Sequence, residues 1–306
     1  MLPELFLRII KAKRFYFLLF FSYIVTIIIV GYSQSGLLLK YDPVSPALDD
    51  EPDDSANVYA SSKMINGVTI NYYHSLSDKK PNCLTLYLRD HVQPVGNIQP
   101  IRDLFQNSQC DFIDLREFQK DSYFTYGYNE SVTFQQFITT LLEELDFTID
   151  QVTLIIEGAS ATTGVLFAIR NPNLHSLIFL DATFGLEDFF QHRLVQSRIV
   201  SLPGITSIAF LLTKVRAGFI GSELSFSMLI QKVRAPVLLV CSVDNYKSGN
   251  ECFELKAEML NEEDKNLTVH QILSSDSRGP MEVRKDQQAI IFQYLTEEGL
   301  TLKTIK

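Results

Sequence analysis

The sequence predicts an α/β domain, with a mostly parallel sheet and helices on both faces, that follows one transmembrane helix. Three observations predict this class. An uncharged apolar run occupies residues 15–32. The pair Asn66-Gly67 separates two strand-like segments, which is a strong hairpin signal because both central residues of the turn need positive φ. Beyond this hairpin, strand-like and helical segments alternate, as they do in parallel sheets covered on both faces.

The apolar run predicts a membrane anchor. With its flanks, it reaches the roughly 20 residues that a helix needs to cross the hydrocarbon core. Basic residues mark the segment 1–14 before it, and residues 33–57 after it contain an acidic cluster. Because positive charge stays in the cytoplasm, we expect a single-pass signal-anchor at 15–32, with 1–14 in the cytoplasm and the domain on the lumenal or extracellular side. The alternative is a cleaved signal peptide, with Gly31 and Ser33 as small residues before the cut.

This topology has chemical consequences. Residues 33–57 are too polar to form a core and are expected to be a linker. The triplets at Asn129 and Asn266 match the N-glycosylation pattern, which matters only in a eukaryotic secretory lumen. The cysteines would lie in an oxidising compartment and could pair, although spacing does not choose the pairing and buried free thiols are the alternative. They are Cys83, Cys110, Cys241 and Cys252.

The folded domain is expected at residues 58–306. The expected strands are 58–65, 68–74, 84–88, 111–115, 152–156, 177–180, 237–240 and 267–273. The expected helices are 98–105, 131–145, 162–170, 252–260 and 285–294. Segment 152–156 is a continuous apolar run, typical of a strand buried on both faces. In segment 131–145 apolar residues recur at helical spacing after Ser131, a candidate cap.

One segment interrupts this alternation. Residues 186–234 have helical character but contain no strand-like run, so we interpret them as an insertion. The overall composition also limits function. A net charge of −9 leaves no general cationic surface to neutralise phosphates, which argues against nucleic-acid binding. No CxxC pair occurs, and we predict neither a metal site nor a cofactor.

The segment that could carry chemistry follows the strand at 152–156. It reads Gly158-Ala-Ser160-Ala161-Thr162 and leads into a helix. A serine on a tight strand-to-helix turn presents its hydroxyl above the sheet, and the next amide can stabilise an oxyanion. Small neighbours are needed because the backbone is crowded there. Serine between small residues is common, so the motif gains weight only from its position in an alternating domain.

From about residue 58 to the carboxyl terminus, the chain resembles the α/β-hydrolase superfamily. The opening hairpin is similar to the first two strands of that family, and the insertion at 186–234 lies where the family has a lid. Three further segments carry the resemblance: His91-Val-Gln-Pro94, Asp114-Leu-Arg116, and the strand that ends at Asp244. The resemblance implies Ser160 as nucleophile and Asp244 as acid, in the order of the family. It implies the amides of Ala161 and Val92 as oxyanion donors.

The sequence departs from the family at the base. The loop that should carry the catalytic histidine, residues 274–282, contains none, and Ser277 or Arg278 occupies the slot. Without an imidazole the serine has no base of suitable pKa. His91 and His192 are the remaining substitutes. Family glycines are also replaced, by Val92, Thr162, Glu117 and Gln119.

Two functions of different classes follow from these observations. The first is a membrane-anchored pseudo-hydrolase that has lost triad chemistry and binds a lipid-like or acyl ligand or a protein partner. The second is an active serine hydrolase that acts on an ester, thioester or lipid-like substrate through Ser160. A purely structural domain in an assembly is a third interpretation. The missing histidine favours the first, because loss of one triad member removes most of the catalytic advantage.

Overall fold

The computed structural model describes residues 2–39, 58–76, 81–89, 98–106, 109–119, 128–182, 205–217, 226–243, 267–273 and 280–297. The chain divides into two compact units. The helical unit comprises Met1–Lys40 with Phe190–Ile220, and the sheet unit comprises Tyr41–Phe189 with Gly221–Lys306. Most of the insertion expected at 186–234 therefore groups with the amino-terminal helix and not with the sheet.

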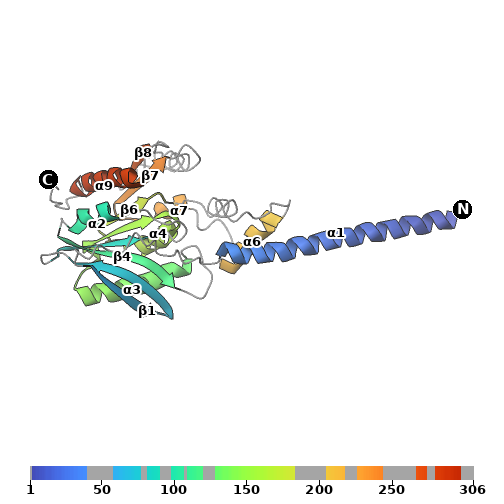
Figure 1. Ribbon diagram of the computed structural model, residues 1–306, viewed down its shortest axis with the longest axis horizontal. Helices are drawn as coiled ribbons and strands as arrows, with labels where there is room; N and C mark the ends of the chain where they lie inside the picture. The colour runs from blue at the N-terminus through green and yellow to red at the C-terminus, as the bar shows by residue number, and fades with distance from the viewer. Residues whose placement is uncertain are drawn as a thin grey trace. The chain divides into compact units, whose positions relative to one another are not determined.

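The described part of the sheet unit contains one eight-stranded sheet with the order β1-β2-β4-β3-β5-β6-β7-β8 (Figure 1). The strands are β1 (Val58–Ile65), β2 (Val68–Ser75), β3 (Cys83–Leu88), β4 (Cys110–Gln119), β5 (Val152–Glu157), β6 (Ser176–Leu180), β7 (Val237–Val243) and β8 (Leu267–Leu273). The pairs β1–β2 and β2–β4 are antiparallel, and the later neighbours are parallel. The predicted mostly parallel sheet is confirmed.

The hairpin between β1 and β2 turns at the predicted pair. Ile65 and Val68 face each other across the turn. Asn66 has φ 51° and Gly67 has φ 75°, the left-handed backbone that a two-residue hairpin turn requires. The strong local signal in the sequence therefore gave the correct turn and register.

Helices cover both faces of the sheet (Figure 1). One face packs against α3 (Tyr128–Leu145), α4 (Ala161–Arg170) and α7 (Phe226–Ile230), and the other against α2 (Gln99–Gln106) and α9 (Pro280–Glu297). The predicted cap Ser131 is wrong, because α3 begins at Tyr128 and Ser131 lies inside it. Its hydroxyl instead accepts a hydrogen bond from Arg170 Nη1 at 3.2 Å.

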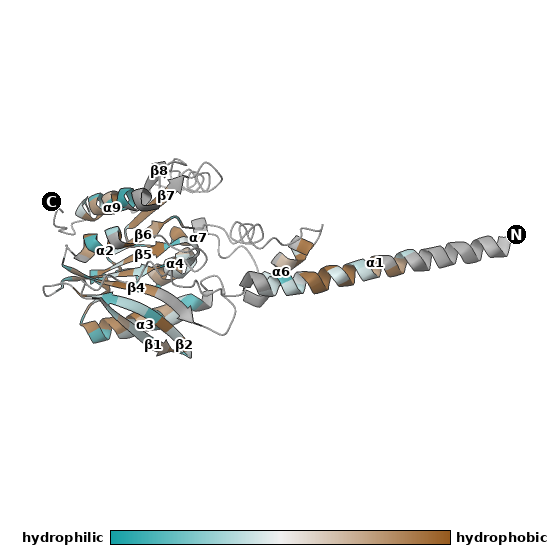
Figure 2. Cartoon of the chain, in the orientation of Figure 1, coloured by the Kyte–Doolittle hydropathy of each residue, from teal (hydrophilic) through white to brown (hydrophobic). Residues whose placement is uncertain are grey.

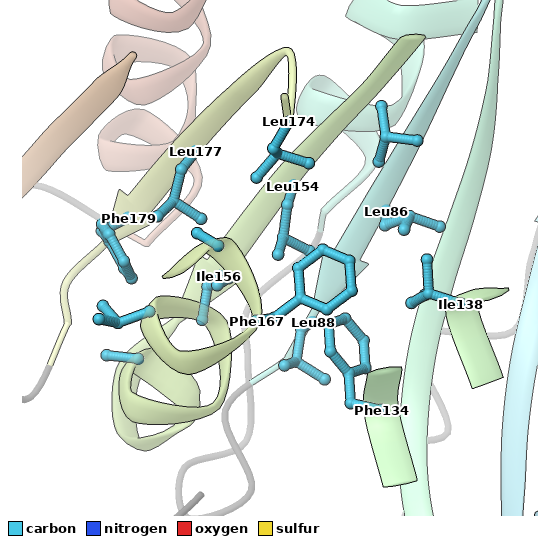
Figure 3. Close-up of a cluster of buried hydrophobic side chains, with 14 of the residues drawn as sticks. Leu86, Leu88, Phe134, Ile138, Leu154, Ile156, Phe167, Leu174, Leu177 and Phe179 are labelled. Carbon is cyan, nitrogen blue, oxygen red and sulfur yellow. The ribbon is translucent and has the colours of Figure 1, made fainter. Parts of the chain in front are cut away.

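The larger core lies between the sheet and helices α3 and α4 (Figure 3). Successive strand residues point to opposite faces, so Leu154 and Ile156 of β5 enter this core while Ile155 enters the other. The rings of Phe134 and Phe167 meet edge to face, with centroids 5.1 Å apart. This contact holds α4 against α3 on the same face of the sheet.

Disulfide bonds are present in the sheet unit. Cys83 and Cys110 are bonded, with Cα atoms 4.6 Å apart, and they are the first residues of the adjacent strands β3 and β4. Cys241 in β7 is also disulfide-bonded. Cys252 lies outside the described residues. The prediction that the cysteines pair is confirmed for these three, and the free-thiol alternative is wrong for them.

The described part of the helical unit consists of α1 (Leu2–Leu39) and α6 (Ile205–Ala217). Within α1, the stretch Tyr16–Gly36 has a mean hydropathy of 2.0 and is long and apolar enough to cross a membrane. Only 12% of its apolar window is buried, which differs from the core helix of a soluble protein. A signal sequence near the amino terminus passes the same test of length and composition. Figure 2 shows the hydrophobic residues along α1.

Candidate functional site

The turn after β5 carries the candidate nucleophile. The strand ends at Glu157, and the chain then turns at Gly158, whose φ of 55° is left-handed backbone that suits glycine. A short 3₁₀ turn, η3 (Gly158–Ser160), leads directly into α4. Ser160 itself has φ −77° and ψ −3°, which are ordinary angles for an L-residue. The left-handed residue of this turn is thus Gly158, and the backbone of Ser160 is unstrained.

The hydroxyl of Ser160 is turned inward. The residue is 0% exposed, and its Oγ donates a hydrogen bond of 2.8 Å to the backbone carbonyl of Arg89. Arg89 directly follows β3, the neighbour of β5 in the sheet. The bond therefore ties the amino end of α4 to the carboxyl end of β3.

The predicted oxyanion donor Ala161 is engaged as well. Its amide N–H donates to the carbonyl of Gly158, which closes the 3₁₀ turn, and the residue is fully buried. An oxyanion donor must direct its N–H at the reacting oxygen. In this conformation the amide of Ala161 has a backbone partner instead.

A buried cluster of charged and polar side chains surrounds the same ends of β3, β4 and β5. Arg89 Nε and Nη2 donate to the two carboxylate oxygens of Asp114 at 2.8 and 2.9 Å. Tyr87 donates from its hydroxyl to Glu157 Oε2 at 2.9 Å. All four residues are less than a tenth exposed. Strand alternation places Tyr87, Asp114 and Glu157 on the sheet face that α2 and α9 cover.

The described histidines lie elsewhere in the sheet unit. His74 of β2 contacts Asp111 of β4, with 3.3 Å between Nε2 and Oδ2. His175 precedes β6 and donates its backbone N–H to the carbonyl of Val152, at the start of β5 and so at the strand end opposite Ser160. His270 lies inside β8, as predicted.

The other predicted site residues, His91, Val92, His192 and Asp244, lie outside the described residues. Asp244 directly follows β7 in the sequence. Of the six predicted site residues, Ser160 and Ala161 lie within the described part of the chain. The roles of all six stay predictions.

Comparison with solved structures decides the fold. Pyrococcus furiosus esterase Pf2001 superposes with a TM-score of 0.58 at 10% identity, over 84% of this chain and 99% of that one. Thermogutta terrifontis esterase 2, phosphoramylated by tabun, gives 0.57 at 12% identity, over 83% and 98%. The chain has an α/β-hydrolase fold. The resemblance seen in the sequence is confirmed at the level of architecture.

The glycosylation associate protein complex Gap123 of Streptococcus agalactiae also matches this α/β-hydrolase fold. The TM-score is 0.52 at 12% identity, over 81% of this chain and 48% of that one. No family model and no curated protein sequence matches the chain. Identities this low establish the fold and leave the activity open.

Sequence reasoning missed the buried cluster at the carboxyl end of this α/β-hydrolase sheet. Its signal was present, because Arg89 and Glu157 are charged residues that directly follow or end apolar strands. The pairing of Arg89 with Asp114 needs knowledge of the strand order β4-β3-β5, which the sequence does not give directly. Asp114 was singled out only as part of a family motif.

A separate pocket of about 330 Å³ lies between the end of α3 and α4, lined by residues such as Ile138, Phe147 and Asn171. It is near the start of β5, away from Ser160. There the hydrogen bond from Thr148 lowers the pKa of the exposed Asp150 carboxyl.

Among the described residues, no group of three or more His, Cys, Asp or Glu side chains could hold a metal ion.

Proposed function

We propose that this protein is a membrane-anchored pseudo-hydrolase, in which the α/β-hydrolase fold binds a ligand or a protein partner without triad hydrolysis. The observation that carries the proposal is the inward hydrogen bond from Ser160 Oγ to the carbonyl of Arg89. A nucleophilic serine needs an exposed hydroxyl and a neighbouring base. Here the hydroxyl is buried and already has an acceptor that cannot take its proton.

Two further observations support the loss of hydrolysis. The amide of Ala161, the expected oxyanion donor, is bonded to Gly158. The loop at residues 274–282, which should return a histidine, has none in its sequence. Each defect alone would lower catalysis by orders of magnitude.

The expected ligand is lipid-like or acylated, because a protein held at a membrane meets such molecules. A protein partner is the other expectation, and the likeness to a chain of the Gap123 complex supports it. The alternative function is a serine hydrolase acting on an ester, thioester or lipid-like substrate. The retained Ser160 and the esterase neighbours favour that alternative.

An organophosphorus probe separates these functions, since one neighbour is described as phosphoramylated by tabun. The full-length protein in mild detergent is treated with a fluorophosphonate, beside Ser160→Ala and an active esterase as positive control. We expect no labelling of either form of this protein while the esterase reacts. Labelling of the native protein that disappears in Ser160→Ala would overturn the pseudo-hydrolase and establish the serine hydrolase.

We also propose that α1 anchors the chain with its sheet unit on the lumenal or extracellular side. The basic segment before the span and the acidic segment after it support this orientation. In a eukaryotic host, Asn129→Gln and Asn266→Gln should each remove a mass that glycosidase also removes. A protein that protease digests fully from the cytoplasmic side of sealed microsomes would have the opposite topology. A mature chain that lacks residues 1–32 would show cleavage in place of anchoring.

A further inference from the structure

Helix α6 packs closely against α1 at Gly31. A Cβ built on Gly31 would lie 2.9 Å from Ile208 Cγ2 and 3.3 Å from the backbone nitrogen of Ala209. Such distances are below ordinary van der Waals contact, so the two backbones approach closely here. Small residues at this kind of contact are typical of helix pairs inside membranes.

The contact occupies one face of each helix. On α1 the buried residues are Ile27, Gly31, Gln34 and Ser35, and on α6 they are Ile205, Ala209 and Thr213. These positions recur at intervals of three or four residues, which is the spacing of a single helical face. The hydroxyl of Thr213 donates to the carbonyl of Ala209 at 2.7 Å, so it needs no partner outside α6.

The position of this contact along α1 decides its surroundings. The four residues of α1 named above lie within Tyr16–Gly36, the stretch with the length and composition of a membrane span. They lie towards the carboxyl-terminal end of that stretch, so a helix packed against them meets the bilayer at that end of the span. At about 1.5 Å per residue, α6 is too short to cross the hydrocarbon core of about 30 Å.

Two of the exposed residues of α6 are large and apolar. Leu211 is 60% exposed and Val215 is 55% exposed, and on α1 the side chains of Ile28 and Ile29 are also exposed. Exposed hydrophobic residues are therefore present on both α1 and α6.

We propose that α6 is a membrane-embedded helix, seated beside the last turns of α1 in one leaflet, with Leu211 and Val215 in contact with lipid acyl chains. This inference rests on the proposed anchor role of α1. It replaces the lid expected from the family resemblance with a second attachment to the bilayer. The Gly31 contact holds α6 against the anchor.

Tryptophan fluorescence tests the lipid contact, because the chain contains no Trp and one introduced ring is the sole reporter. Leu211→Trp is made in the full-length protein and reconstituted into phosphatidylcholine vesicles with brominated acyl chains. We expect blue-shifted emission that bromine quenches severalfold. Phe20→Trp, on the exposed side of α1, reports the anchor, and Met64→Trp, 73% exposed on β1, reports water.

The outcomes separate this inference from the anchor. Quenching of Phe20→Trp with unquenched, red-shifted emission from Leu211→Trp would overturn the lipid contact of α6 and retain the anchor. Absence of quenching at both positions would overturn the anchor itself. Quenching at both, with none at Met64→Trp, is the expected result.

Cysteine cross-linking tests the contact between α6 and α1. The Cβ built at position 31 is 3.4 Å from Ile208 Cβ, close to the separation of a disulfide. Gly31→Cys with Ile208→Cys should form an intramolecular bond in membranes, whereas Ser33→Cys with Ile208→Cys should not, because Ser33 is exposed. A disulfide-linked dimer would instead make a second copy of the chain the partner of α6 and overturn the inference.

A bulky residue at the glycine gives an independent check. Gly31→Leu should displace α6 and reduce the quenching of Leu211→Trp, while the matched variant Ser33→Leu should leave it unchanged. Equal quenching in both variants would show that α6 inserts without the Gly31 contact. It would overturn the inference that this contact holds α6 in place.

Discussion

The ion pair between Arg89 and Asp114 is the most consequential pair of side chains in the buried cluster. Both are almost fully buried, with side chains 9% and 5% exposed, and the guanidinium binds the carboxylate through two parallel hydrogen bonds. Because both charges have left water, their mutual attraction offsets part of the cost of burying them. The pair also fixes the chain at Arg89, whose carbonyl receives the Ser160 hydroxyl.

Removing one charge of this pair should therefore be costly. We expect Asp114→Asn to lower the free energy of unfolding by about 3–5 kcal/mol, because the buried carboxylate that binds the Arg89 guanidinium through two hydrogen bonds would lose its charge. The matched control is Glu144→Gln, which breaks the surface pair of Lys63 and Glu144, where the carboxylate is 55% exposed. That change should cost less than about 1 kcal/mol. Denaturant unfolding measures both, and equal effects would contradict the argument.

Gly164 is needed for a different reason, because a side chain at this position would have no room. A Cβ there would lie 1.5 Å from Ile156 Cδ1, where α4 crosses β5. We expect Gly164→Ala to destabilise the protein by about 1–3 kcal/mol through overpacking, and Ile156→Val to recover part of this by removing the clashing methyl group. Thermal unfolding of the single and double variants measures the coupling.

Gly67 is the control for this prediction. Nothing lies within 4 Å of a Cβ at Gly67, but its φ is positive. Gly67→Ala should cost about 1 kcal/mol from backbone strain alone, and Ile156→Val should give it no rescue. If Ile156→Val also stabilised the Gly67→Ala variant, its effect would be a general change in the core and not relief of the clash at position 164.

At the scale of elements, a disulfide bond joins the first residues of the strands β3 and β4 and should stabilise their pairing. The bond closes a loop whose ends are 27 residues apart in sequence. A loop of this size predicts about 3–4 kcal/mol of stabilisation through the unfolded state. We expect Cys83→Ala, Cys110→Ala and the double variant to lose similar stability in thermal unfolding, since each breaks the same bond. Additive losses would indicate that packing of the two side chains dominates.

Elements with strong local signals could be predicted from the sequence. Asn66-Gly67 fixed the first hairpin, and the strand predicted at 267–273 matches β8. Boundaries were less accurate where tertiary pairing extends an element. β4 continues to Gln119, beyond the apolar core that ends at Leu115, because it pairs with β2 from Phe112 to Gln119.

The candidate site was predicted only in part. The motif located the turn of Ser160, since small residues after a buried strand mark it. The direction of the hydroxyl could not be predicted, because it depends on the carbonyl of Arg89, a residue 71 positions away in the chain. The contact of α6 with α1 was missed for the same reason. Both join residues far apart in the chain, and local patterns in the sequence do not say which distant segments pair.

At the scale of the whole molecule, the helical unit joins two segments far apart in sequence, Met1–Lys40 and Phe190–Ile220. Deletion of residues 1–39 would remove the surface that covers Ile205, Ala209 and Thr213 of α6. We expect the shortened protein to aggregate without detergent despite the loss of its anchor. Light scattering and gel filtration with and without detergent measure this. A shortened protein that stays monomeric in plain buffer would contradict it.

The bond between Cys83 and Cys110 also determines how the chain responds to a protease. The backbone from 83 to 110 forms a closed covalent ring that includes α2. A single cut inside that ring opens it without releasing a fragment, so the nicked chain keeps its full mass on a denaturing gel until a reductant is added. Damage in this region would therefore go unnoticed under non-reducing conditions, and both halves would remain available to the sheet.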